Sequence, residues 1–113
     1  MSGELSFFEL GTGDYEKAAA FYSDLFGWEF EAMGSGGRIR TPALPGGIHG
    51  DDAGASPYVF FAVDDLDRAL GKVHELGGSG ESMGEDPDAA SEFGRFALCK
   101  DDQGSSFGLH EKP

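Results

Sequence analysis

Two residues in the first half of the chain, Glu9 and His49, have side chains suited to proton transfer or polar-ligand binding. The imidazole of His49 ionises near neutral pH, which suits acid–base catalysis. A hydrogen-bonded or solvated residue at a strand end is the plainer interpretation of His49. Glu9 interrupts an apolar strand, and a buried carboxylate is costly unless it is paired or used. We therefore expect Glu9 either to face a hydrated site or to pair with a cation such as Arg38 or Arg40.

Aromatic residues on two predicted strands are candidates for ligand contact. Tyr58 and Phe60 share one strand face, and Phe7 lies on the matching face in the first half of the chain. Aromatic walls suit a planar or apolar ligand. The alternative is that these rings simply fill the core.

Other chemically versatile residues are interpreted as structural. Cys99 ends the apolar run that begins at Phe96, so we expect a small buried hydrophobe. His74 falls in the last turn of a predicted helix, where a solvated cation is favoured. The acidic pairs at 51–52 and 101–102 lack the spacing of a calcium loop. The turn expected at 34–37 is not followed by Lys-Ser or Lys-Thr, so it is not a phosphate loop.

An internal repeat positions these residues. Residues 7–27 resemble residues 58–78 at a constant offset, and the Asp residues that begin the two predicted helices, Asp14 and Asp65, lie 51 positions apart. Each copy has a β-like aromatic run, an Asp helix cap, acids in the first turn and apolar residues at helical spacing. Gly27 and the pair Gly77–Gly78 are expected to end the helices.

Strand and turn patterns follow each predicted helix. The Gly/Asp/Ser-rich stretch 50–56 joins the copies, and 85–91 is a polar loop. Each copy is expected to contain a strand, a helix and then about three strands. This order occurs twice and predicts an α+β fold. In the first copy, the expected later strands are 28–33 and 38–41, and the stretch 42–49 holds a Pro-Gly-Gly break before another strand. In the second copy they are 80–83, 95–100 and 105–110.

Composition limits the partners. The chain has 113 residues, enough for one domain, and 39% are hydrophobic, enough for one core. The net charge of −13 argues against nucleic acid and membrane surfaces as partners, and it favours cationic ligands or serves solubility alone. No cationic leader with an apolar run and no apolar stretch of about 20 residues is present, so we expect a soluble, cytoplasmic protein.

Several stretches resemble a known family: Phe8–Leu10, Ala20–Trp28, Phe61–Asp65, Gly94–Gly104 and Phe107–Leu109. With its two βαβββ units, the chain resembles the vicinal oxygen chelate superfamily, in particular its small glyoxalase-like branch. The superfamily includes glyoxalase I, extradiol dioxygenases, and fosfomycin- and bleomycin-resistance proteins. Asp102 departs from that branch, which usually has Pro there. The resemblance implies one domain over 1–113 with repeats at about 4–50 and 57–111, a cup-shaped mixed sheet, and a homodimer.

The resemblance also implies where a metal would be held. Metal-dependent members use two first-strand and two last-strand positions, which fall here on Phe7, Tyr58, Gly108 and, when 45–49 is aligned with 104–108, on His49. A catalytic metal normally needs three His, Asp, Glu or Cys ligands. Only His49 qualifies, so we expect the usual metal site to be lost and no cofactor to be bound.

A displaced metal site is the alternative. Glu9 shares a strand face with Phe7, and His110 shares one with Gly108. His49, Glu9 and His110 would then form a two-His, one-carboxylate set.

Two function classes follow from the resemblance. The first is a non-catalytic protein that binds a small organic molecule, for example a cationic aromatic compound, as bleomycin-binding proteins do. Its ligand-binding residues would be Phe7, Glu9, His49, Tyr58, Phe60, Gly108 and His110. The second is a glyoxalase-like lyase or isomerase, or a dioxygenase-type enzyme, either metal-free with His49 and Glu9 as acid and base or using a displaced metal.

Overall fold

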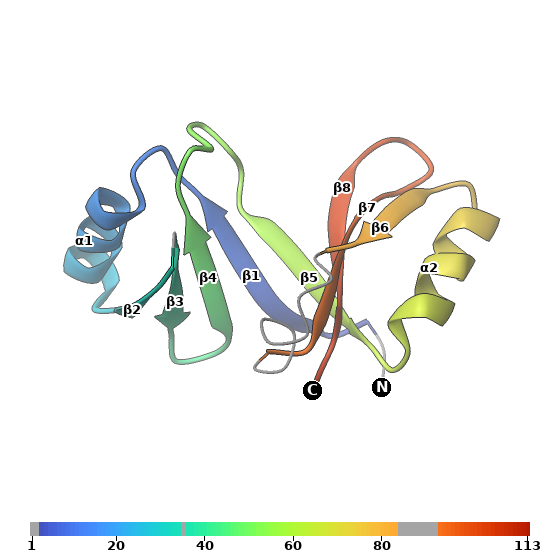
Figure 1. Cartoon of the computed structure of the whole chain (residues 1–113), viewed down its shortest axis with the longest axis horizontal. Helices are drawn as coiled ribbons and strands as arrows, with labels where there is room; N and C mark the ends of the chain where they lie inside the picture. Colours follow the sequence, from blue (N-terminus) through green and yellow to red (C-terminus); the bar gives the residue numbers. More distant parts are fainter. Residues whose placement is uncertain (1–2, 35, 84–92) are drawn as a thin grey trace. The chain divides into compact units, whose positions relative to one another are not determined.

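A computed structural model describes residues 3–34, 36–83 and 93–113, which form eight strands and two helices (Figure 1). They fall into two compact units, Phe7–Tyr58 and Met1–Ser6 with Val59–Pro113. The loop expected at 85–91 lies outside the described residues. The elements are β1 (Leu5–Gly11), α1 (Tyr15–Phe26), β2 (Glu29–Met33), β3 (Gly36–Arg40), β4 (Pro45–His49), β5 (Tyr58–Val63), α2 (Leu66–Glu75), β6 (Ser79–Ser82), β7 (Arg95–Lys100) and β8 (Ser106–Glu111).

The unit Phe7–Tyr58 contains a mixed sheet in the order β2-β3-β4-β1. β2 and β4 run antiparallel to β3, whereas β1 runs parallel to β4. Leu10, Ile39 and Ile48 form the buried core, and Ile39 has no exposed surface. Partly buried residues of α1, including Tyr15, pack against that core and hold the helix on the sheet.

The unit that contains Val59–Pro113 repeats this arrangement in the order β5-β8-β7-β6. β5 is parallel to β8, and β7 is antiparallel to both β8 and β6. Leu66 at the start of α2 is fully buried against Ala97, Cys99 and Leu109. The two βαβββ units with mixed sheets confirm the predicted α+β fold, and Cys99 is the small buried hydrophobe expected from its apolar neighbours.

Both helices begin at the predicted Asp residues. The Asp14 carboxylate accepts hydrogen bonds from the backbone N–H groups of Glu16 and Lys17, and Asp65 accepts one from Arg68. These bonds satisfy amides that the first helical turn leaves without partners.

The helix ends differ from the repeat. Gly27 after α1 has the left-handed φ of 75° that a side chain disfavours. The corresponding left-handed residue after α2 is Gly77, with φ 95°, one position before the residue that the 51-residue offset predicts. α2 has 10 residues, whereas α1 has 12.

Two predicted strand boundaries are corrected. Gly36 and Gly37 are not part of a turn; they lie in β3 and pair with Met33 and Ala32 of β2. Pro45, Gly46 and Gly47 do not form a break before the strand; they are the first residues of β4, and Pro fits this first position because it cannot donate a ladder hydrogen bond.

The strand registers also correct the predicted equivalence of the last strands. Glu9 pairs with Gly47, and Phe60, its counterpart in the second copy, pairs with Gly108. Two residues on, Gly11 pairs with His49 and Ala62 pairs with His110. His49 therefore corresponds to His110 and not to Gly108. The alignment of the glycine-rich 45–49 with 104–108 was wrong because buried apolar residues, Ile48 and Leu109, fix the register instead.

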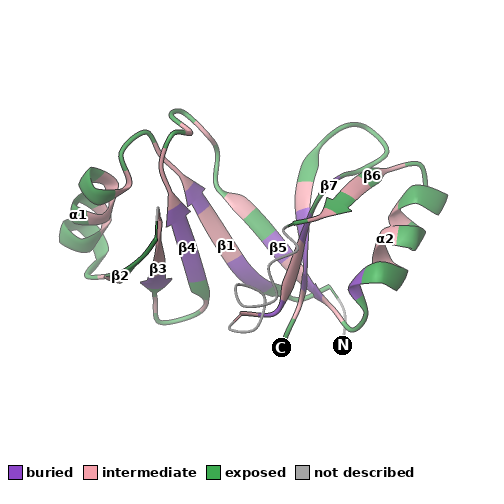
Figure 2. Ribbon diagram, in the orientation of Figure 1, coloured by how far each residue is buried: buried purple, intermediate pink, exposed green. Residues whose placement is uncertain are grey.

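Most of the buried residues lie in the strands and few lie in the helices (Figure 2). α1 has no buried residue, and Phe21, Leu25 and Phe26 in its second half are more than half exposed. Among the described residues, no helix is long and apolar enough to cross a membrane.

Candidate functional site

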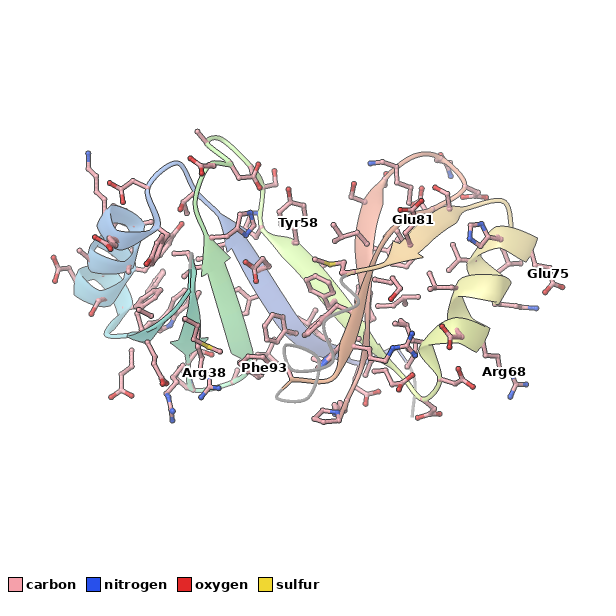
Figure 3. All side chains as sticks on the ribbon, in the orientation of Figure 1. Arg38, Tyr58, Arg68, Glu75, Glu81 and Phe93 are labelled. Carbon is pink, nitrogen blue, oxygen red and sulfur yellow. The ribbon has the colours of Figure 1, made fainter. Side chains whose placement is uncertain are left out.

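His49 lies between two carboxylates. Its Nδ1 is 2.6 Å from Glu9 Oε2, and its Nε2 is 2.8 Å from Asp52 Oδ2. The Tyr58 hydroxyl donates to the same Asp52 oxygen at 3.1 Å. The four side chains form one hydrogen-bonded chain within the unit Phe7–Tyr58. We call it the His49 network; Figure 3 labels Tyr58, its last member, at the start of β5.

The backbone around His49 is fixed by the end of β1. Thr12 donates to the His49 carbonyl twice, from its amide at 2.9 Å and from its hydroxyl at 2.8 Å. Asp51 then takes a left-handed φ of 55°, which turns the chain back on itself. The Asp52 amide donates to the Thr12 carbonyl at 2.8 Å. This turn brings the Asp52 carboxylate to the imidazole three residues earlier.

Two glycines make room for the carboxylates. A Cβ at Gly47 would lie 2.1 Å from Glu9 Oε1, and a Cβ at Gly11 would lie 2.3 Å from Asp52 Oδ2. Any side chain at either position would therefore displace a carboxylate from His49. The positions that the two carboxylates occupy therefore depend on glycine at 11 and 47.

The partners of His49 decide its protonation. Each ring nitrogen faces a carboxylate oxygen, and a carboxylate only accepts hydrogen bonds, so the arrangement favours an imidazolium that donates from both nitrogens. The hydrogen bond to Glu9 is the largest cause of a raised His49 pKa, and Asp52 adds to it. Burial raises the pKa of Glu9, although its bond to His49 acts in the opposite direction.

The outer half of the network is more exposed. The pKa of Asp52 lies below its usual value, mainly because of the hydrogen bond with His49 and then because of the bond from Tyr58. The same Asp52 bond raises the pKa of the Tyr58 hydroxyl. The side chains of His49 and Asp52 are 38% and 36% exposed and that of Glu9 is 25% exposed, so solvent and solutes reach all three.

The structure brings together three of the predicted site residues, Glu9, His49 and Tyr58, and adds Asp52 to them. Asp52 was considered only as half of an acidic pair; its position three residues after a candidate histidine was the available signal. Glu9 was expected either to face a hydrated site or to pair with a cation such as Arg38 or Arg40, and the structure pairs it with His49. Both arginines instead approach Glu31, at 3.6 and 3.5 Å.

The remaining predicted residues are buried. Phe7 is 5% exposed and belongs to the unit of the His49 network. Phe60, Gly108 and His110 belong to the other unit. A Cβ at Gly108 would lie 2.2 Å from the Phe60 ring, so that ring covers the glycine.

His110 has a different environment from its repeat counterpart. Its Nε2 lies 2.6 Å from the Phe93 carbonyl oxygen, which only accepts, so this nitrogen carries the proton. Nδ1 then accepts from the Ser6 hydroxyl at 2.8 Å. The ring stacks on Phe96 with centroids 4.5 Å apart. Burial lowers the pKa of His110, and the ring is neutral near neutral pH.

The donor atoms do not fit the metal site of metal-dependent relatives. Phe7, Gly108 and Gly47, which the corrected register makes the counterpart of Gly108, have no side-chain ligand atom, and the Tyr58 hydroxyl bonds to Asp52. His49, the position expected from the sequence, has both nitrogens bonded to carboxylates. For the displaced set, both nitrogens of His110 are likewise engaged, by Ser6 and Phe93. Among residues 3–34, 36–83 and 93–113, no three His, Cys, Asp or Glu side chains are grouped to hold a metal ion.

Two surface hollows lie away from the His49 network. One of about 620 Å³ is lined by α1, β2 and their connection, with Trp28 and Phe30 among its walls. The other, of about 870 Å³, is lined mainly by α2 and includes Leu109. Neither contains a residue of the network, so neither is the candidate site.

Comparison with known proteins identifies the family. Residues 5–37 match the family model described as bleomycin resistance protein-like N-terminal. A glyoxylase-like domain-containing protein from Didymella fabae is 34% identical over 93 residues, covering 69% of this chain and 71% of the relative. The chain belongs to the vicinal oxygen chelate superfamily. The family resemblance inferred from the sequence is therefore confirmed.

Solved structures of this superfamily share the fold. Homoprotocatechuate 2,3-dioxygenase from Brevibacterium fuscum matches with a TM-score of 0.70 and 18% identity over 98% of this chain, and 37% of the dioxygenase is covered. Methylmalonyl-CoA epimerase from Mycobacterium tuberculosis matches with a TM-score of 0.60 and 16% identity, covering 98% of this chain and 88% of the epimerase. The chain spans well under half of the dioxygenase, and at these identities the likeness shows the fold alone.

Proposed function

We propose that this chain binds a small organic cation at the His49 network without using a metal. One observation carries the proposal: both ring nitrogens of His49 are engaged by carboxylates, so the most suitable metal-ligand residue of the unit is committed to hydrogen bonds. The same arrangement leaves carboxylate oxygens on a solvent-accessible surface, where they can accept hydrogen bonds from a ligand.

Charge supports a cationic ligand. The ionised network contains two carboxylates and one imidazolium, which leaves one net negative charge, and the whole chain carries −13. A cation is attracted by both the local and the overall field. The nearby Tyr58 ring, 6.3 Å from the His49 ring, supplies an aromatic face for a planar ligand.

The experiment measures binding of ethidium and bleomycin, with the uncharged phenanthridine as comparator, by calorimetry in EDTA. We expect binding of the cations that weakens with salt, and a loss of about tenfold or more in Glu9→Gln and Asp52→Asn. Glu29→Gln and Asp102→Asn, at exposed positions outside the network, serve as matched controls. Equal affinity for phenanthridine, no binding at all, or a stoichiometric metal found by elemental analysis would overturn the proposal.

A second candidate function is favoured by the continuity of the hydrogen bonds. Glu9, His49, Asp52 and Tyr58 are linked in series, which is the arrangement that relays protons in acid–base catalysis. His49 and Glu9 would then act as acid and base of a metal-free glyoxalase-like isomerase or lyase. The test is turnover of methylglyoxal with glutathione in EDTA: activity lost in His49→Gln but kept in His74→Gln supports this candidate, and inactivity of the wild type removes it.

The organisation of the protein is part of the proposal. We propose one domain over residues 1–113 and a cytoplasmic location. We also propose a homodimer, since among the described strands β2 and β6 each pair on one side only and uncovered edges favour association.

A further inference from the structure

The side of α1 that faces away from its sheet carries two exposed hydrophobic side chains. Phe21 is 61% exposed and Leu25 is 58% exposed, and they lie four residues apart on one face of the helix. Such side chains gain free energy when a partner covers them. At about 100° per residue, five exposed residues fall on this side, and we call them the outer face of α1: Lys17, Ala20, Phe21, Asp24 and Leu25.

The second copy of the repeat shows which residues the corresponding helix face carries when it is exposed to solvent. The 51-residue offset places Lys72 at the position of Phe21, with Arg68 and Glu75 at those of Lys17 and Asp24. Lys72 and Glu75 form an exposed ion pair at 3.8 Å on α2. Arg68 and Glu75 point away from the sheet (Figure 3). The two faces carry charges of the same sign at their ends. They differ at the centre, where α2 has a lysine and α1 has a phenylalanine.

The charges on the outer face of α1 are complementary to themselves. Lys17 and Asp24 lie about 10 Å apart along the helix, one on each side of Ala20 and Phe21. If a second α1 packs antiparallel with its two-fold axis between Ala20 and Phe21, each Lys17 faces Asp24 of the partner subunit. Each Phe21 ring then faces Ala20 of the partner subunit, whose small side chain permits close approach. A contact of this kind is the isologous interface that two-fold symmetry requires.

We infer that the outer face of α1 binds a second copy of this chain through an antiparallel α1–α1 contact. The Phe21 ring is already oriented for this contact by Tyr22, against which it packs edge-on at 5.2 Å. Repulsion between two chains of charge −13 opposes association, but at physiological ionic strength it is screened beyond about 8 Å. One helix pair is at the low end of interface sizes, so we expect a weak dimer. The inference deepens the proposed homodimer by placing its contact on α1 and not on the strand edges, and it is independent of the ligand.

Sedimentation velocity, from low-micromolar to several hundred micromolar protein, tests the contact. We expect the wild type to approach twice the monomer mass. Phe21→Lys, which installs the residue found in α2, should weaken dimerisation by about tenfold or more. Leu76→Lys is the matched control, because Leu76 is 66% exposed after α2 and corresponds to Leu25. It should leave the dimer unchanged.

A charge exchange separates a specific contact from general stickiness. Lys17→Asp and Asp24→Lys should each weaken the dimer, and the double variant should restore it, because the opposed charges are then swapped and not lost. Both single changes suit the helix dipole, so each variant should fold. A dimer insensitive to Phe21→Lys, or one not restored by the double exchange, would overturn the α1 contact and leave the proposed homodimer standing. A wild type that stays monomeric would overturn both.

Discussion

His49 and His110 occupy the same position in the two copies of the repeat, opposite Gly11 in β1 and Ala62 in β5. His49 is flanked by two carboxylates, whereas His110 is held by a carbonyl and a hydroxyl and stacked on Phe96. The first environment favours the imidazolium and the second the neutral ring. The same position of the repeat therefore holds an accessible, charged histidine in the first copy and a buried, structural histidine in the second.

Stability should depend on pH through His49. Its pKa is raised above the ordinary 6.5, so the stabilisation by its carboxylate partners is complete below pH 6.5 and is lost as pH rises through the folded-state pKa. We expect His49→Gln to cost about 1 kcal/mol or less at about pH 6, because the site is partly exposed and solvent screens it. The difference from wild type should shrink towards pH 9.

Comparing the two proteins measures the contribution of His49 together with its effect on the pKa values of Glu9 and Asp52. Urea unfolding across this pH range is the measurement. A difference that grows with pH would contradict the assigned ion pairs.

The glycine beneath Glu9 provides a second test. Gly47→Ala should displace the Glu9 carboxylate, because the new Cβ would lie 2.1 Å from Oε1. Loss of that bond should lower the His49 pKa towards its ordinary value, which histidine NMR would detect. Gly71→Ala is the control: its Cβ meets open space in α2, and we expect a gain of about 0.5–1 kcal/mol in unfolding free energy. An unchanged His49 titration in Gly47→Ala would show that Glu9 does not set its pKa.

Ser6→Ala tests the buried histidine. Removing the hydroxyl leaves Nδ1 of His110 without the donor at 2.8 Å, in a side chain only 4% exposed. An unsatisfied buried acceptor costs about 1–3 kcal/mol. Thermal or urea unfolding should show this loss, while Ser23→Ala on the exposed side of α1 should be close to neutral. Equal stability of Ser6→Ala and wild type would mean that the Ser6 hydroxyl does not stabilise His110.

Local sequence signals predicted most of the fold. The Asp14 and Asp65 caps and the repeated helices follow from neighbouring residues, and the structure confirms them. The register of the last strands could not be read from glycine content, because Ile48 and Leu109 set it through long-range burial. The Gly-Ile-His and Gly-Leu-His triplets at 47–49 and 108–110 carried the correct alignment.

The site was only partly predictable for a similar reason. Glu9 stood out as a charge within an apolar strand, and His49 as an ionisable residue at a strand end. The role of Asp52 depends on the left-handed turn at Asp51 and on Thr12 from β1. Neither contact has a local sequence signature, so the second carboxylate on the imidazole required the three-dimensional structure.

NMR titration of the histidine rings, with His49 assigned through His49→Gln, tests whether carboxylates on both ring nitrogens keep His49 charged. We expect His49 to titrate above 6.5 with both ring nitrogens protonated below that midpoint, and His110 to titrate below 6.5. A His49 midpoint at or below that of His110 would contradict it.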